Sequence, residues 1–226
     1  MTRPQIVCHM IASLDGRLLA DRWPASEAAL LETYDGAAER LGAEGWIAGR
    51  RTMEHYVPTG EPAAGGPAAQ ARDRIADRRG RRLAIGFDRS GRLRPESGDL
   101  DGDHLVIVMS ERVSEAHVSE IAARGVSVVL AGPDGNAVAG ALARIGAAFG
   151  VRRLLLEGGG TLNGAFVAAG LVDETSTLIW PVLDGQRGVP AIYDRDAATT
   201  PTALEAISAE LLPCGTVWLR HRVVTG

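Results

Sequence analysis

Short runs of Val, Ile and Leu alternate with helix-like segments along almost the entire chain, and this alternation constrains the fold more than any other feature. Runs of this kind, short and apolar without interruption, are typical of strands that are buried on both faces of a sheet. They lie at residues 6–12, 45–48, 82–85, 105–109, 126–130 and 154–156.

Helical periodicity fills several of the gaps between these runs. Apolar residues recur at helical spacing in two places, at Val138, Leu142, Ile145 and Phe149 and again at Leu162, Phe166 and Ala169. Segments 26–40 and 114–124 each begin with a serine that is suited to capping a helix. Strands and helices in this order predict an α/β fold with a mostly parallel central sheet.

The C-terminal part of the chain follows a different pattern. Residues 175–182 and 216–223 have strand character, and a long polar stretch without a strong helical pattern separates them. We expect these strands to pair as an antiparallel hairpin at the edge of the sheet. Because the chain contains no clear linker and no internal repeat, a single domain over residues 1–226 is expected.

Composition and charge exclude several classes of function. A net charge of −4 argues against a general nucleic-acid binder. All 24 basic side chains are arginine, so lysine-dependent Schiff-base chemistry, pyridoxal-phosphate chemistry and a Walker loop are excluded. No apolar run approaches the ~18 residues of a membrane span, and the N-terminal residues carry no export pattern. We expect a cytoplasmic protein that acts on a small molecule.

Neither cysteine nor histidine spacing suggests a bound metal. Cys8 and Cys214 lie far apart in the sequence, which argues against a disulfide framework or a cysteine zinc cluster. His9, His55, His117 and His221 are isolated from one another, so no metal site is expected.

Residues 58–82 are rich in Pro, Gly and Ala and end in a run of six arginines between Arg72 and Arg82. Asp73 and Asp77 interrupt this basic run. It is expected to be a solvated loop or a short surface helix, with binding of a phosphorylated ligand as the alternative.

The strongest local motif joins a buried strand, a glycine turn and an amphipathic helix. It consists of Glu157, Gly158, Gly159, Gly160, Thr161, Leu162, Asn163 and Gly164. Glycines let the backbone approach a ligand closely, and the N-terminus of a helix presents free N–H groups to an anion. The motif therefore predicts a phosphate or pyrophosphate site, and the alternative is a tight turn whose glycines serve packing alone.

Two further candidate anion sites follow other strands. Gly49, Arg50, Arg51 and Thr52 come directly after the run 45–48. Thr52 is expected to cap a short helix over residues 54–56, and the arginines can bind phosphate oxygens. Ser110 and Arg112 follow the run 105–109 and could hold the 2′-phosphate that distinguishes NADPH from NADH. Each of these segments could instead be a surface turn or a helix start.

Three anion sites at the C-terminal ends of strands favour one extended dinucleotide over three coincidences. Asp15 follows the first strand, so this carboxylate and Glu157 are candidates to orient or protonate a substrate. The alternatives are a turn residue for Asp15 and a strand-end residue for Glu157. A hydrolase that uses Ser13 or Ser110 is disfavoured, because neither serine lies in a GxSxG elbow.

Taken together, these segments resemble the C-terminal reductase domain of riboflavin biosynthesis, a member of the dihydrofolate-reductase-like superfamily. The resemblance extends from Ile6 to Val223. Its landmarks are residues 13–17, 49–52, 149–151, 157–161, 169–174 and 180–185. It implies a three-layer sandwich with a mostly parallel central sheet and an antiparallel C-terminal edge.

The resemblance also implies an NADPH-dependent reductase and a homodimer formed through the terminal strands. The best-known substrate of the family is a ribosylaminopyrimidine phosphate of the 5-amino-6-(5-phosphoribosylamino)uracil type. By this resemblance, Gly159 to Gly164 hold the cofactor, Glu157 contacts the substrate, and the corner from Ala12 to Asp15 lies beside the nicotinamide.

The chain departs from the family pattern in two places. Residues 49–56 lack the Asp-Asp-Pro stretch that riboflavin reductases commonly carry, and residues 1–226 contain no HxE with a PCxxC, the signature of the zinc deaminase module often fused to this domain. A dihydrofolate-reductase-like oxidoreductase with another substrate, or a non-catalytic NADPH-binding module, therefore remains an alternative.

Overall fold

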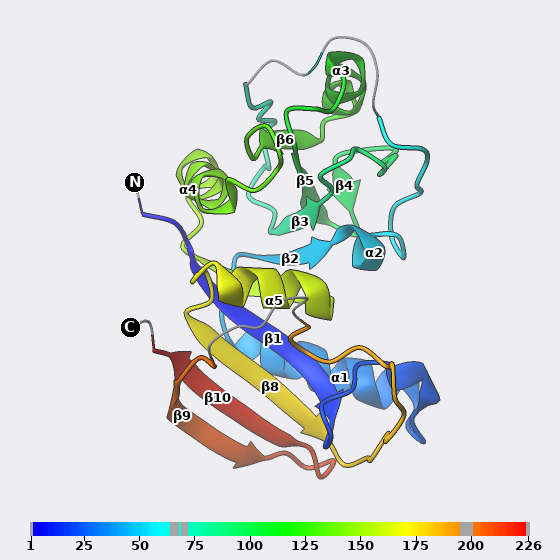
Figure 1. Ribbon diagram of the computed structural model, residues 1–226, viewed down its shortest axis with the longest axis vertical. Helices are drawn as coiled ribbons and strands as arrows, with labels where there is room; N and C mark the ends of the chain where they lie inside the picture. Colours follow the sequence, from blue (N-terminus) through cyan, green and yellow to red (C-terminus); the bar gives the residue numbers. More distant parts are fainter. Residues whose placement is uncertain (1, 64–67, 69–71, 195–200, 225–226) are drawn as a thin grey trace. The chain divides into compact units, whose positions relative to one another are not determined.

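The computed structural model describes residues 2–63, 68, 72–194 and 201–224 (Figure 1). The chain divides into two compact units. The first unit comprises Met1–Pro4 and Glu44–Leu154, and the second comprises Gln5–Ala43 and Leu155–Gly226. The expectation of a single domain over residues 1–226 stays a prediction.

The sheet of the first unit is built from neighbouring parallel strands. Its order is β2 (Gly45–Gly49), β3 (Leu83–Phe87), β5 (Asp103–Met109) and β6 (Ser127–Leu130), and the short β4 (Asp99–Leu100) pairs antiparallel with the start of β5. All residues of β3 and β6 are buried, as the continuous apolar runs predicted. The helices are α2 (Arg50–Met53), α3 (Glu115–Ala123) and α4 (Val138–Phe149), and both α3 and α4 contact β6.

The arginine-rich run covers the open edge of β6. The Arg74 N–H donates to the carbonyl of Val128 at 2.8 Å, and the Val128 N–H donates back to the carbonyl of Arg74 at 2.7 Å. Arg74 pairs with Glu115 of α3, and Arg144 of α4 pairs with Asp73. An extended segment that satisfies the backbone groups of an edge strand protects that strand from pairing with another chain. In the described residues 72–82, the run therefore has a structural role, and it forms no helix.

The second unit contains a sheet with both parallel and antiparallel strand pairs. Strand β1 (Gln5–Ser13) pairs in parallel with β8 (Glu174–Trp180), β8 pairs antiparallel with β10 (Val217–Val223), and β10 pairs antiparallel with β9 (Leu204–Leu211). Figure 1 shows these strands side by side in this order. The last residues of β7 (Arg153–Leu156) belong to this unit, as do the 3₁₀ turn η1 (Ala20–Arg22), α1 (Glu27–Arg40) and α5 (Gly160–Ala168).

The α/β fold with parallel strands and an antiparallel C-terminal edge is confirmed, but the edge itself was wrongly assigned. β8 and β10 pair as expected, yet β8 lies between β1 and β10, and β9 forms the outer strand. All eight residues of β9 are exposed, so no alternation of buried and exposed positions marks this strand in the sequence. Trp180 of β8 and Trp218 of β10 are accordingly buried, at 8% and 3% exposed.

Serine caps begin two of the helices as expected. The Ser26 hydroxyl accepts from the Ala29 N–H at the start of α1, and the Ser114 hydroxyl accepts from the His117 N–H at the start of α3. No helix in the described residues is long and apolar enough to cross a membrane.

A buried chain of hydrogen bonds connects β1 with β8, β10 and α1 in the second unit. The Trp218 indole N–H donates to the Ser176 hydroxyl at 2.7 Å, and that hydroxyl lies 2.9 Å from His9 Nδ1. His9 Nε2 lies 3.2 Å from the carbonyl of Tyr34 in α1. The Tyr34 carbonyl can only accept, so Nε2 of the neutral ring carries the proton, and Nδ1 accepts from the Ser176 hydroxyl. His9 is therefore held as a neutral imidazole with both nitrogens satisfied.

This arrangement predicts that stability falls in acid. Burial lowers the pKa of His9 to about 4 from the usual 6.5, so the unfolded chain takes up a proton on His9 before the folded chain does. Stability conferred by neutral His9 is complete above pH 6.5 and is lost as the pH falls towards 4, by about 3 kcal/mol in all.

Urea unfolding between pH 7 and pH 4.5 measures the effect. His9→Gln removes the titrating group, so this variant should be less stable at pH 7 but should lose less stability on acidification than wild type. An unchanged pH slope in the variant would contradict the assignment.

Candidate functional site

The glycine motif has the predicted strand–turn–helix geometry. β7 ends at Leu156, Gly159 is the N-cap residue of α5, and the helix begins at Gly160. A Cβ built on Gly158 would lie 3.2 Å from Met10 Cε, so the turn lies against β1. Cys8 and Met10 share one face of β1, and the alternation of a strand places Ala12 on that face as well. Ala12 and Gly158, both predicted to line the cofactor site, therefore lie on the same face of the second unit.

The N-terminus of α5 keeps free donors. The N–H groups of Leu162 and Asn163 both donate to the Gly159 carbonyl, and the N-cap residue offers no side-chain acceptor. Among the residues that the structure describes, the N–H groups of Gly160 and Thr161 have no acceptor. Two unpaired N–H groups at a helix N-terminus suit an anion.

A segment that follows β8 packs directly on this helix start. A Cβ on Gly160 would lie 2.1 Å from the Ala191 carbonyl oxygen, so only glycine fits there. The Asp194 N–H donates to the Gly160 carbonyl at 3.1 Å, and Asn163 Nδ2 donates to the Ile192 carbonyl at 3.0 Å. The glycines thus serve packing, and a phosphate or pyrophosphate site at this turn stays a prediction.

The predicted cofactor residues of α5 differ in accessibility. Thr161 is exposed and Leu162 is partly buried, whereas Gly160, Asn163 and Gly164 are buried. The Oδ1 atom of Asn163 is buried without a hydrogen-bond partner in the described structure. Asn163 therefore fixes the segment at Ile192 with its amide nitrogen and retains one unused acceptor.

Asp15 is tied into a turn. Its carboxylate accepts from the Ser13 hydroxyl at 2.7 Å and from the N–H groups of Asp184 and Gly185, both at 3.0 Å. These hydrogen bonds, that from Ser13 first, hold the pKa of Asp15 well below its usual range. Asp15 consequently stays ionised at neutral pH and cannot supply a proton, which matches the turn role left open by the sequence.

Glu157 differs from Asp15 in its surroundings. It is partly buried and immediately precedes Gly158, which lies against Met10. Both carboxylates belong to the second unit. That they line one substrate pocket stays a prediction.

Gly49, Arg50, Arg51 and Thr52 form the start of a helix, but Thr52 does not cap it. α2 begins at Arg50 with Gly49 as its N-cap residue, and Thr52 lies inside the helix rather than before residues 54–56. The chain enters the helix earlier than expected because Met53 is drawn into the apolar core. Arg50 is paired with Glu54, whereas Arg51 is exposed.

Ser110 and Arg112 line a pocket of about 390 Å³ in the first unit, together with residues that the sequence analysis missed. Arg89 and Ser90 follow β3, and Asn136 follows the loop after β6. The rule that had pointed to Ser110, a polar residue at the C-terminal end of a parallel strand, would also have found Arg89. The buried Asp88 fixes this turn by accepting from the N–H groups of Arg92 and Leu93.

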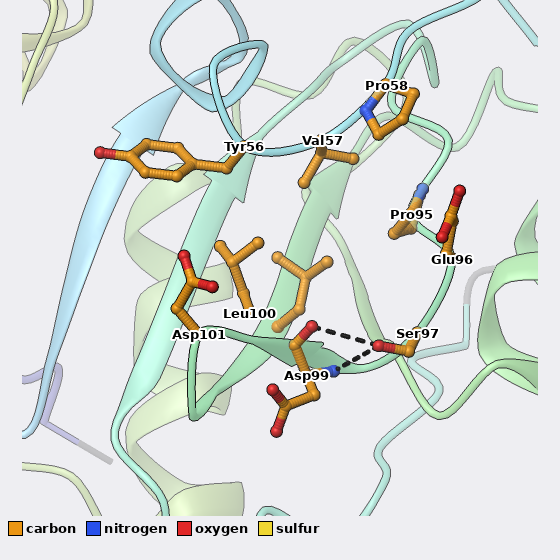
Figure 2. Close-up of a pocket in the computed structure, with 10 residues that line it drawn as sticks. Tyr56, Val57, Pro58, Pro95, Glu96, Ser97, Asp99, Leu100 and Asp101 are labelled. Carbon is orange, nitrogen blue, oxygen red and sulfur yellow. Dashed lines mark hydrogen bonds between the residues drawn. The ribbon is translucent and has the colours of Figure 1, made fainter.

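A second pocket in the first unit, of about 380 Å³, has the opposite charge (Figure 2). Its wall combines Tyr56, Val57 and Leu100 with the acidic residues Glu96, Asp99 and Asp101. β4 pairs with the start of β5, so this pocket lies at the N-terminal end of that strand. An acidic wall repels phosphate, so of these two pockets the one that contains Arg89 and Arg112 suits an anion. Among the described residues, no group of three or more His, Cys, Asp or Glu could hold a metal ion.

Comparison with known proteins agrees with this fold. A pyrimidine reductase-like protein of Corynebacterium diphtheriae superimposes with a TM-score of 0.69 at 17% identity, over 99% of this chain and 93% of that chain. RibD of Acinetobacter baumannii superimposes with a TM-score of 0.67 at 20% identity, over 98% of this chain and 58% of that chain. At such identities the similarity shows the fold alone.

Sequence comparison identifies the family. A 2,5-diamino-6-ribosylamino-4(3H)-pyrimidinone 5′-phosphate reductase of Archaeoglobus fulgidus is 38% identical over 58 residues, which is 26% of each protein. This curated relative is thus matched over about a quarter of its length. Residues 4–218 match the RibD C-terminal domain profile. The chain therefore belongs to the RibD C-terminal domain family, as the sequence motifs had suggested.

Proposed function

We propose that this protein is an NADPH-dependent reductase that acts on a ribosylaminopyrimidine phosphate in riboflavin biosynthesis. The observation that carries the proposal is the match to the RibD C-terminal domain over residues 4–218. The partial match to the pyrimidinone phosphate reductase of Archaeoglobus fulgidus supports the same substrate class.

Each unit, taken by itself, offers donor groups that suit a phosphate. The first unit offers a basic pocket with Ser110, Arg112 and Arg89 for a phosphomonoester. The second unit offers the free N–H groups of Gly160 and Thr161 for a phosphate diester. When bound, NADPH supplies the hydride.

The two carboxylates are assigned different tasks. Asp15 holds the backbone at Asp184 and Gly185 and remains ionised, so it organises the loop after β8. Glu157 is assigned to bind the amine or hydroxyl groups of the substrate. Because hydride addition to a C=N or C=O group needs one proton, that proton comes from Glu157 or from water, and not from Asp15.

The departure at residues 49–56 favours a second candidate, a reductase of the same fold that acts on another substrate. Arg50 is neutralised by Glu54, and no Asp-Asp-Pro stretch is present for the substrate. Turnover of a ribosylaminopyrimidine phosphate separates the two candidates, and a non-catalytic module would bind NADPH without oxidising it in the presence of either class of substrate.

The proposed function predicts that NADPH raises the melting temperature much more than NADH at equal concentration. Binding to the folded state alone stabilises it by RT ln(1 + [L]/Kd), so the difference in shift reports the difference in affinity. NADPH oxidation at 340 nm, followed after addition of the pyrimidine phosphate, then tests catalysis. Equal shifts with both cofactors would refute the stated preference, and absence of any shift would refute the reductase itself.

Separate replacement of the two carboxylates should give different outcomes. Glu157→Gln should lower kcat at least about tenfold, with little change in melting temperature or in the Kd for NADPH. Asp15→Asn should lower the melting temperature, because the amide replaces one of the two acceptor oxygens with a donor and so loses one of the hydrogen bonds from the N–H groups of Asp184 and Gly185. Full turnover in the double variant would show that neither residue serves the reaction.

We also propose that the protein is a homodimer joined through β9, the outer strand of the second unit. β9 is exposed along its whole length and carries Leu204, Ile207 and Leu211, which are 48%, 41% and 73% exposed. A free edge strand with exposed apolar side chains is suited to pairing with a second copy across a twofold axis.

Light scattering at micromolar concentration should therefore give twice the chain mass of 23.8 kDa. Ile207→Lys places a charge on the exposed strand and should shift the equilibrium towards the monomer without lowering secondary-structure content. A monomeric mass for wild type would contradict the proposal.

A further inference from the structure

The basic pocket of the first unit holds two arginines in different electrostatic states. Arg112 is 76% exposed in its side chain and pairs with the carboxylate of Asp134. Arg89 donates from NH1 to Asn136 Oδ1 at 3.0 Å, and an amide oxygen carries no charge. In the described part of the chain, no carboxylate lies within ion-pair distance of Arg89. Arg89 thus keeps its full positive charge, whereas that of Arg112 is already compensated.

The surroundings of Arg89 fix where its guanidinium lies. A Cβ on Gly135 would lie 2.9 Å from Arg89 Cγ and 3.0 Å from Cδ, so the aliphatic part of Arg89 packs against this glycine. Gly135 has a φ of +69°, a conformation that other residues rarely adopt. The packing and the bond to Asn136 together limit the rotamers of Arg89, which lowers the entropy that a ligand must remove.

A hydroxyl group lies beside this guanidinium. The Ser110 N–H donates to the Arg89 carbonyl at 3.2 Å, which sets the ends of β3 and β5 side by side. Ser110 lines the pocket, and its side chain has no hydrogen-bond partner among the described residues. An uncompensated guanidinium with a neighbouring hydroxyl is a donor set for phosphomonoester oxygens.

We propose that Arg89, positioned by Asn136, is the residue that selects the 2′-phosphate of NADPH, and that Arg112 has a secondary role. This inference rests on the proposed function for the identity of the ligand. It changes the assignment made from the sequence, in which Ser110 and Arg112 alone held this phosphate. Asn136 is a positioning residue because it acts through Arg89.

Calorimetric titration of the full-length protein with NADPH and NADH tests the proposal. Arg89→Gln removes the charge, so the Kd for NADPH should rise about tenfold or more, while that for NADH should change less than about twofold. Arg112→Gln should have a smaller effect on NADPH. Arg152→Gln, which removes an exposed arginine outside the pocket and so gives the same net charge, is the matched control.

Asn136→Asp is the second variant, and it keeps Arg89 in place. The new carboxylate would neutralise the guanidinium, so it should weaken NADPH binding in the way that Arg89→Gln does and leave NADH binding unchanged. A merely structural role for Asn136 would affect both cofactors equally. This variant also keeps the proposal testable if Arg89→Gln does not fold.

Adenosine 2′-monophosphate is the probe that separates this inference from the proposed function. If wild type binds this compound and Arg89→Gln does not, the pocket assignment holds even where no reductase activity is found. If wild type prefers NADPH over NADH and Arg89→Gln keeps that preference, the proposed function stands and the inference is overturned. Competition by ribose 5-phosphate at equal affinity would also overturn it, because the pocket would then take a substrate phosphate.

Discussion

The parallel strands of the first unit are buried on both faces, and this burial determines where polar residues can lie. β3 and β6 are buried along their entire length, so no polar side chain can lie along them without losing its hydration. Polar residues are therefore displaced to the strand ends, where Asp88, Arg89 and Ser110 appear in immediate succession to β3 and β5. The chemistry of the first unit collects at this position because the interior of the sheet excludes it.

Location at a strand end does not by itself decide what a charged residue does. Asp15 and Arg89 both follow a buried strand, but the partners that surround them differ. Asp15 accepts hydrogen bonds from its own chain and is committed to holding a turn. Arg89 meets only a neutral amide and keeps its charge for a ligand. A residue is thus available for function to the extent that its own chain leaves its charge or hydrogen-bonding groups unsatisfied.

In several parts of the molecule the positive charge of an arginine is compensated by a neighbouring carboxylate. Arg50 pairs with Glu54, Arg40 with Glu210, and Arg81 with Asp99. Exposed pairs of this kind add little stability, but each reduces the positive potential that a phosphate would meet. A chain without lysine and with a net charge of −4 therefore has fewer phosphate-binding positions than its number of arginines suggests.

Sequence patterns were sufficient to predict the α/β class, the strand–glycine–helix motif at residues 157–164 and the polar strand ends, because hydrophobic periodicity and backbone chemistry are local. They did not reveal β9, whose exposed residues leave no periodic signal, nor the helix start at Arg50, which burial of Met53 sets. The folded chain was needed to show that Asp134 compensates the charge of Arg112 and that Arg89, 23 positions earlier in the sequence, lines the same pocket. Such pairings join residues that are distant in sequence, and they depend on which strands become neighbours.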